Sequence, residues 1–170
     1  MAYLGQLIWL VPLALHAGYF LATVFHFSPL LRVAEQSHEI ARWQFAVGWC
    51  AVIGAANLAF LVLIYWLPRM RDSMLQVPGR DYWLSTSELR IELVSRLRGV
   101  CSSALFGLNI FFLAVYQMIY QSHVSRPFLV MSQVYLIIFF MIIPLFVSLF
   151  SMVLTLRSLA ADVSAAQGKG

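Results

Sequence analysis

Four long apolar stretches, separated by polar segments, set the pattern of this chain. They cover residues 3–27, 43–67, 100–120 and 128–156, and none of them contains Lys, Arg, Asp or Glu. Because a helix of about 20 apolar residues is long enough to cross a bilayer, each stretch is predicted to span a membrane. The expected fold is all-α, an integral membrane four-helix bundle, with one domain over residues 1–157 and a flexible tail over residues 158–170.

The longest polar interruption, residues 68–99, is predicted to form a short amphipathic surface helix. Ser85 followed by Glu88 has the spacing of a capping box, which marks a helix start. Leu89, Leu93 and Leu97 then fall on one helical face, which we expect to lie on the membrane surface. Gly99 would let the chain turn into the third span. The segment holds six of the eleven basic residues: Arg69, Arg71, Arg80, Arg90, Arg96 and Arg98.

The basic residues also predict an orientation. If residues 68–99 are cytoplasmic, their six arginines together with Arg157 and Lys169 place eight basic residues inside. Arg32, Arg42 and Arg126 would be outside, in the polar loops 28–42 and 121–127. Cytoplasmic loops of membrane proteins are enriched in Lys and Arg, so both termini are expected in the cytoplasm. Arg90, Arg96 and Arg98 are expected to reach lipid phosphates, and the rings of Tyr82 and Trp83 to anchor in the headgroup layer rather than to contact a ligand.

The composition narrows the class of protein. The chain is 62% hydrophobic and 11% charged, whereas soluble domains carry about 25% charged residues. The net charge of +4 comes from residues beside the spans, so the lipid bilayer, and not nucleic acid, is the expected partner. No acidic residue lies in a predicted span, and no catalytic constellation is evident, so we expect neither an ion-coupled transporter nor an enzyme.

The motif in the central segment resembles a known family. VPGRDYWL, followed by STSELRIELVSRLRG, is similar to the N-R-D-Y-W-L-x-P-E-R-R segment of small bacterial membrane proteins that carry a domain of unknown function shared with the SdpI immunity protein. The pair His26-Phe27 resembles the His-Phe pair after the first span of that family. Gly79 stands where the family has Asn, Ser-Thr-Ser where it has Ala-Pro, and the Gly and Asp that follow His-Phe are missing. Over about residues 16–127 the resemblance implies the same architecture and the bacterial cytoplasmic (inner) membrane.

His16 is a candidate functional residue because an ionisable group near the middle of a span is costly. One interpretation is an axial ligand to a single chlorophyll or haem, and another is a step on a proton path. The third is a neutral His that is hydrogen-bonded to a neighbouring helix. No other cofactor is expected.

A metal site is the second candidate. His26, Glu35, His38 and His123 are all predicted on the outer side, and Glu35 and His38 are three residues apart, so they could share a helical face. Zn²⁺ and Cu²⁺ accept such ligands. The alternative is a solvated loop, since no HxxxH or CxxC spacing is present.

Asn57 and Asn109 are expected to meet inside the bundle. Each lies near the middle of its span, where an unpaired amide costs several kcal/mol. Small residues recur every four positions in both spans, at Ala51, Ala55 and Ala59 and at Gly99, Ser103 and Gly107. Such stripes let helices approach closely, so we expect the two amides to be hydrogen-bonded to each other or through one shared neighbour.

Three functions fit these observations. The first is a non-catalytic accessory or scaffold subunit of a larger membrane complex, in contact with other membrane subunits. The second is an immunity or signal-transducing membrane protein, as the family resemblance implies. The third is a pigment or haem binder that uses His16.

Overall fold

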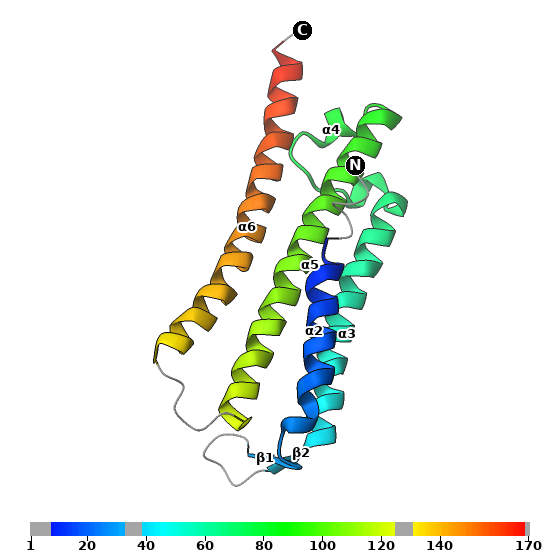
Figure 1. Cartoon of the computed structure of the whole chain (residues 1–170). Coiled ribbons are helices and arrows are strands. Elements are labelled where there is room, and N and C mark those ends of the chain that lie inside the picture. Colours follow the sequence, from blue (N-terminus) through cyan, green and yellow to red (C-terminus); the bar gives the residue numbers. More distant parts are fainter. Residues whose placement is uncertain (1–7, 33–38, 125–130, 169–170) are drawn as a thin grey trace.

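The computed structural model describes residues 8–32, 39–124 and 131–168, and these are almost entirely helical (Figure 1). The α-helices are α2 (Leu10–Thr23), α3 (Arg42–Trp66), α4 (Arg80–Trp83), α5 (Ser87–Val124) and α6 (Met131–Gln167). Short 3₁₀-helices cover Val24–His26, Leu67–Arg69 and Asp72–Met74. In Figure 1, α2 and α5 run in one direction and α3 and α6 in the other. The predicted all-α fold is confirmed.

Within the described residues, three helical segments are long and apolar enough to cross a membrane: Arg42–Arg69, Ser87–His123 and Phe146–Ala166. Leu10–His26 is a shorter apolar helix, and residues 1–7 of the first predicted span lie outside the described residues. Pro12 lies in the first turn of α2, where a missing backbone N–H breaks no helical hydrogen bond. The chain therefore has the helices of a membrane protein.

Helix α5 is the central element of the fold. It packs against α6 on one side and against α2 and α3 on the other, as Figure 1 shows. No residue from 96 to 121 is exposed. A helix that is apolar all round is typical of such a surrounded position. The described residues therefore form an open arrangement about α5, in which α6 makes its main contacts with α5.

The prediction of a separate surface helix is wrong. Residues 87–98 form the first turns of α5, which runs without interruption from Ser87 through Gly99 to Val124. Its 38 residues correspond to about 57 Å, well beyond a hydrocarbon core of about 30 Å. Gly99 has a helical conformation, and the helix start is also different. The hydroxyl of Thr86, and not of Ser85, accepts a hydrogen bond from the Leu89 amide at 3.3 Å.

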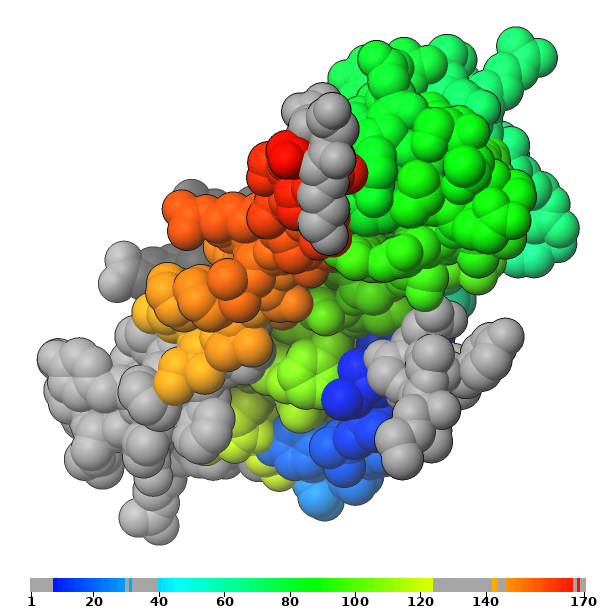
Figure 2. All heavy atoms as spheres, turned by 90° about the horizontal axis from the view of Figure 1, so that it is seen from above, coloured from blue at the N-terminus to red at the C-terminus, as the bar shows by residue number. Residues whose placement is uncertain are grey.

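The prediction of a flexible tail is wrong as well. Helix α6 continues through residues 158–167, and Leu159 is fully buried. These turns lie beside the projecting start of α5, as the view in Figure 2 shows. We call residues 67–98 together with residues 157–167 the platform. Its core consists of Leu67, Leu75, Trp83, Leu93, Val94 and Leu159.

At the opposite end, the predicted polar loop 28–42 begins and ends as a two-stranded antiparallel sheet. Strand β1 (Leu30–Arg32) pairs with β2 (Glu39–Ala41), with Leu31 opposite Ile40. The Arg42 Nη1 donates to the carbonyls of Phe25 and Phe27, each at 3.1 Å. This arginine therefore ties the start of α3 to the end of the α2 segment.

The two small-residue stripes do not face each other. On α5, Gly107 is buried and the Ser103 carbonyl accepts a hydrogen bond from Ser148 of α6 at 2.9 Å, so that stripe faces α6. On α3, Ala51, Ala55 and Ala59 are all exposed. The packing face of α3 instead carries Ile53 and Asn57.

Candidate functional site

His16 is buried between three helices, with 3% of its surface exposed. Its Nε2 accepts a hydrogen bond from the Trp49 indole N–H at 2.9 Å, and the two rings stack with centroids 5.9 Å apart. Nδ1 has no hydrogen-bond partner among the described residues. This hydrogen bond between two helices agrees with the third interpretation from the sequence, in which His16 is hydrogen-bonded to a neighbouring helix. To bind a haem or chlorophyll through Nε2, His16 would have to lose its hydrogen bond from Trp49. Pigment ligation therefore stays a prediction, and this geometry does not favour it.

A cluster of aromatic and hydroxyl groups extends from His16 toward the sheet. The Tyr116 hydroxyl pairs with Thr23 Oγ1 at 2.9 Å, and Tyr19 donates to the Gln117 amide oxygen. Tyr116 is fully buried and lies against His16 with ring centroids 5.7 Å apart. Sequence reasoning missed these residues, although Tyr116 and Tyr120 share a helical face, because each Tyr reads as an ordinary apolar residue within a span.

Two of the four candidate metal ligands, His26 and His123, lie among the described residues. Glu35 and His38 lie outside the described residues. The Nδ1 atoms of His26 and His123 lie 3.2 Å from the Tyr120 hydroxyl and 2.9 Å from the Ile119 carbonyl, respectively. Among the described residues, no group of three or more His, Cys, Asp or Glu side chains is placed to hold a metal ion. The metal site stays a prediction.

Asn57 and Asn109 make a reciprocal pair of hydrogen bonds. The Nδ2 of Asn57 donates to Oδ1 of Asn109 at 2.9 Å, and Nδ2 of Asn109 donates to Oδ1 of Asn57 at 3.0 Å. Asn57 also donates to the Ile53 carbonyl at 2.9 Å. Both amides are buried. The predicted hydrogen bonding of the two amides is confirmed in the first of its two forms, a direct contact. The stripe that suggested it on α3 nevertheless faces the other way.

The leucines expected on the membrane surface pack inside the platform. Leu93 is fully buried, while Leu89 and Leu97 pack against the platform core. Trp83, expected in the headgroup layer, is 1% exposed, and its indole N–H has no partner among the described residues. Tyr82 is half-buried beside it. The prediction of a lipid-facing surface is wrong because the end of α6 supplies a protein surface for the same face.

Arg90, Arg96 and Arg98, which are expected to reach lipid phosphates, each bind protein groups. Arg90 forms an ion pair with Asp72 at 3.0 Å and donates to the carbonyls of Met70 and Pro68 at 2.9 and 3.3 Å. It therefore fastens the connection after α3 to the first turn of α5. The Arg98 Nε donates to the Ile64 carbonyl at 3.2 Å, near the end of α3, where a cation also complements the helix dipole.

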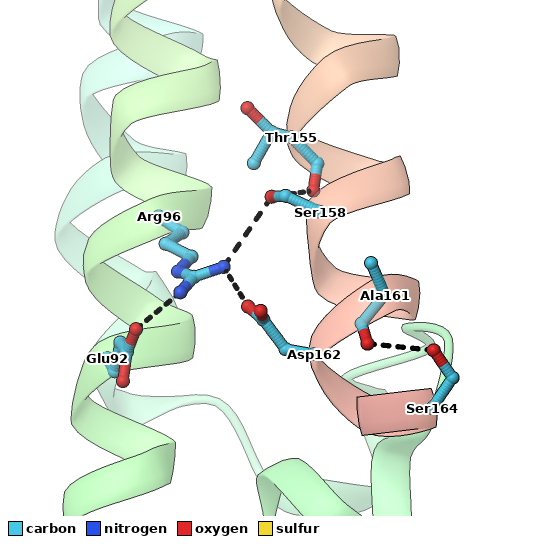
Figure 3. A network of polar contacts seen from close by, with 7 residues as sticks. All are labelled: Glu92, Arg96, Thr155, Ser158, Ala161, Asp162 and Ser164. Carbon is cyan, nitrogen blue, oxygen red and sulfur yellow. Dashed lines mark hydrogen bonds and ion pairs between the residues drawn. The ribbon is translucent and has the colours of Figure 1, made fainter. Parts of the chain in front are cut away.

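Arg96 joins α5 to α6 (Figure 3). Its Nη2 binds Glu92 at 2.5 Å and its Nη1 binds Asp162 at 2.7 Å. The guanidinium carbon also lies 5.2 Å from the centre of the Trp83 ring. The pair of Glu92 and Arg96 was visible in the sequence from its spacing of four residues. Asp162 was not, because it lies in the segment predicted to be a flexible tail.

A cavity of about 430 Å³ opens beside this network. Its walls come from α4, the first turns of α5 and the last turns of α6, and they include Tyr82, Trp83, Glu92, Arg96 and Asp162. A second cavity, of about 350 Å³, lies beside the end of α3 and is lined by Trp66, Arg69, Met70, Arg71 and Met74. The first cavity brings charges of both signs and two aromatic rings to one place.

Comparison of the chain with protein-family models, curated proteins and solved structures finds no match. The resemblance to the SdpI domain therefore stays a prediction from the Tyr-Trp-Leu motif.

Proposed function

We propose that this chain is a non-catalytic accessory or scaffold subunit of a larger membrane complex, held in that complex through α3. The observation that carries the proposal is the outward face of α3, where Gly48, Ala51, Ala55 and Ala59 are exposed. At Gly48 and Gly54, an added Cβ would meet no atom within 4 Å. The face is therefore open along the middle of the helix.

The position of this face supports a contact with another protein. Gly48 and Asn57 are nine residues apart, which is about two and a half helical turns, so the small residues lie opposite the face that packs on α5. Lipid tails are as apolar as protein side chains, and close backbone approach is therefore a main source of helix association in membranes. Small residues on a face that no described part of this chain covers fit a helix from another subunit.

The sequence supports a role without ion transport or catalysis, since its acidic residues all lie outside the predicted spans. The excess of basic residues on the platform supports a cytoplasmic platform. The resemblance of the Tyr-Trp-Leu motif supports a location in the bacterial inner membrane. In that orientation the α3 face lies within the bilayer, and the platform faces the cytoplasm.

The experiment changes the α3 face in the full-length chain and follows association in native membranes. Ala55→Leu adds bulk in the centre of the face, and we expect it to abolish co-purification of other membrane subunits in mild detergent. Val47→Leu is the matched control, since Val47 is exposed on the same helix and lies about 80° around the helix axis from Ala55. It should leave co-purification unchanged.

A photo-crosslinking residue at position 55 provides the second readout. We expect adducts with a different membrane protein, and these should be weaker with the crosslinker at position 47. Unchanged co-purification in Ala55→Leu together with lipid adducts alone would contradict the proposal. Adducts that contain only this chain would replace it with self-association.

A further inference from the structure

We propose that the platform cavity beside Arg96 is a binding site for a small organic cation that carries a primary ammonium group. The cavity volume of about 430 Å³ lies within the range of about 300–1,000 Å³ that is typical of small-molecule sites. Its walls come from α4, the start of α5 and the end of α6, and α6 is far from the other two in the sequence. This proposal does not depend on the contacts of α3 in the membrane.

The charge of the cavity favours a cation. Glu92 and Asp162 each use one carboxylate oxygen to bind Arg96, namely Oε1 and Oδ2. The second oxygen of each carboxylate makes no hydrogen bond among the described residues. Two carboxylates and one guanidinium leave one net negative charge on the wall. Figure 3 shows both carboxylates converging on the same guanidinium from α5 and α6.

The aromatic wall favours an organic cation over a bare metal ion. Tyr82 and Trp83 are arranged edge to face, with ring centroids 5.2 Å apart. The guanidinium of Arg96 lies over the Trp83 ring, so this wall already holds one cation against a π face. Aromatic rings attract ammonium groups in the same way. The half-buried ring of Tyr82 and the two free carboxylate oxygens supply the contacts that such a group uses.

An anion is a poorer fit, although an arginine lines the cavity. Arg96 is neutralised by two carboxylates, and an incoming anion would meet their repulsion at close range. Glu92 and Asp162 keep about half of their side-chain surface, 50% and 44% exposed, so a cation can reach them without unfolding the platform.

The test uses the full chain in phosphatidylcholine nanodiscs, labelled with 5-fluorotryptophan. Trp83→Phe assigns the ¹⁹F signal of Trp83, and 1,4-diaminobutane is the probe. We expect a saturable shift of the Trp83 signal with this diamine and no shift with butane-1,4-diol, which has the same chain length without the charges. Asp162→Asn and Glu92→Gln should each weaken diamine binding at least tenfold.

Glu88→Gln is the matched control. It removes the same charge one turn earlier on α5, from a residue that does not line the cavity, and binding should persist. The Trp83 signal of each variant without ligand shows whether the platform is still folded. The absence of a saturable shift in the unaltered protein, an equal response to the diol, or an equal loss in Glu88→Gln would each overturn the proposal.

Discussion

At the scale of single residues, Gly79 carries two constraints at once. Its φ is +68°, a conformation that L side chains rarely adopt. An added Cβ would lie 2.2 Å from the Val163 side chain of α6. Gly79 therefore allows the turn before α4 to lie directly against the end of α6.

We predict that Gly79→Ala lowers stability by roughly 1–3 kcal/mol through backbone strain and overpacking. Thermal unfolding in detergent measures the change. Gly99→Ala is the control, because Gly99 is helical and an added Cβ meets nothing within 4 Å. That change should be neutral or slightly stabilising. Equal melting temperatures for the two variants would show that Val163 does not press on this turn.

Gly79→Asn separates the two constraints. Asn adopts the left-handed conformation more readily than Ala, and it is the residue at this position in the family that the motif resembles. If the contact with Val163 dominates, Gly79→Asn should be as destabilising as Gly79→Ala. If backbone strain dominates, most of the stability should return.

The pair of Asn57 and Asn109 gives a second prediction at this scale. The reciprocal hydrogen bonds should contribute a coupling of about 0.6–2 kcal/mol. A double-mutant cycle with Asn57→Leu and Asn109→Leu, measured by unfolding in mixed detergent, tests this value. Asn57→Leu combined with Gly99→Ala should be additive and serves as the control. Simple additivity of the two Asn changes would contradict the contact.

At the scale of elements, the continuity of α5 is the main difference from the sequence interpretation. Apolar residues in the first turns of α5 face the end of α6 and the connection after α3, and this packing holds these turns in line with the rest of the helix. Arg90 and Arg96 add ion pairs to both of these neighbours. The apolar face at the start of α5 is therefore buried by protein contacts and not by a lipid surface.

Spin labels at positions 91 and 122 test this continuity. On one straight helix they are 31 residues apart, so we expect a separation of about 46 Å. A right-angle turn at Gly99 would shorten it to about 37 Å by the same geometry. Labels at positions 100 and 122 are the control, since both arrangements give about 33 Å. Pulsed electron paramagnetic resonance in nanodiscs measures these distances, and the shorter value for the first pair would refute the straight helix.

At the scale of the whole molecule, the platform and the sheet lie at opposite ends of the helices (Figure 1). The charge distribution predicts that the platform is cytoplasmic. A cysteine at position 38 should therefore react with an impermeant thiol reagent on intact cells, and a cysteine at position 76 should react only after lysis. Each is introduced into a Cys50→Ser, Cys101→Ser background, which is the unlabelled control. The reverse pattern would invert the orientation.

The sequence by itself determined the helical class, the apolar segments and the pairing of the two asparagines. Hydrocarbon leaves a backbone few options other than helix, and a buried amide must find a partner, so these outcomes follow from local composition and depth. The ion pair of Glu92 and Arg96 also follows from local spacing, because residues four apart are neighbours on any helix.

Only the tertiary structure decided which surface each amphipathic face meets. An apolar face is satisfied equally well by lipid and by another helix, so Leu93 and Trp83 gave no sign of packing inside the platform. Likewise, the alanines of α3 could face α5 or the outside. The ion pair between Arg96 and Asp162 joins residues far apart in the sequence, and it forms because α6 stays helical to its last turns. The cavity beside that pair therefore exists only in the folded chain.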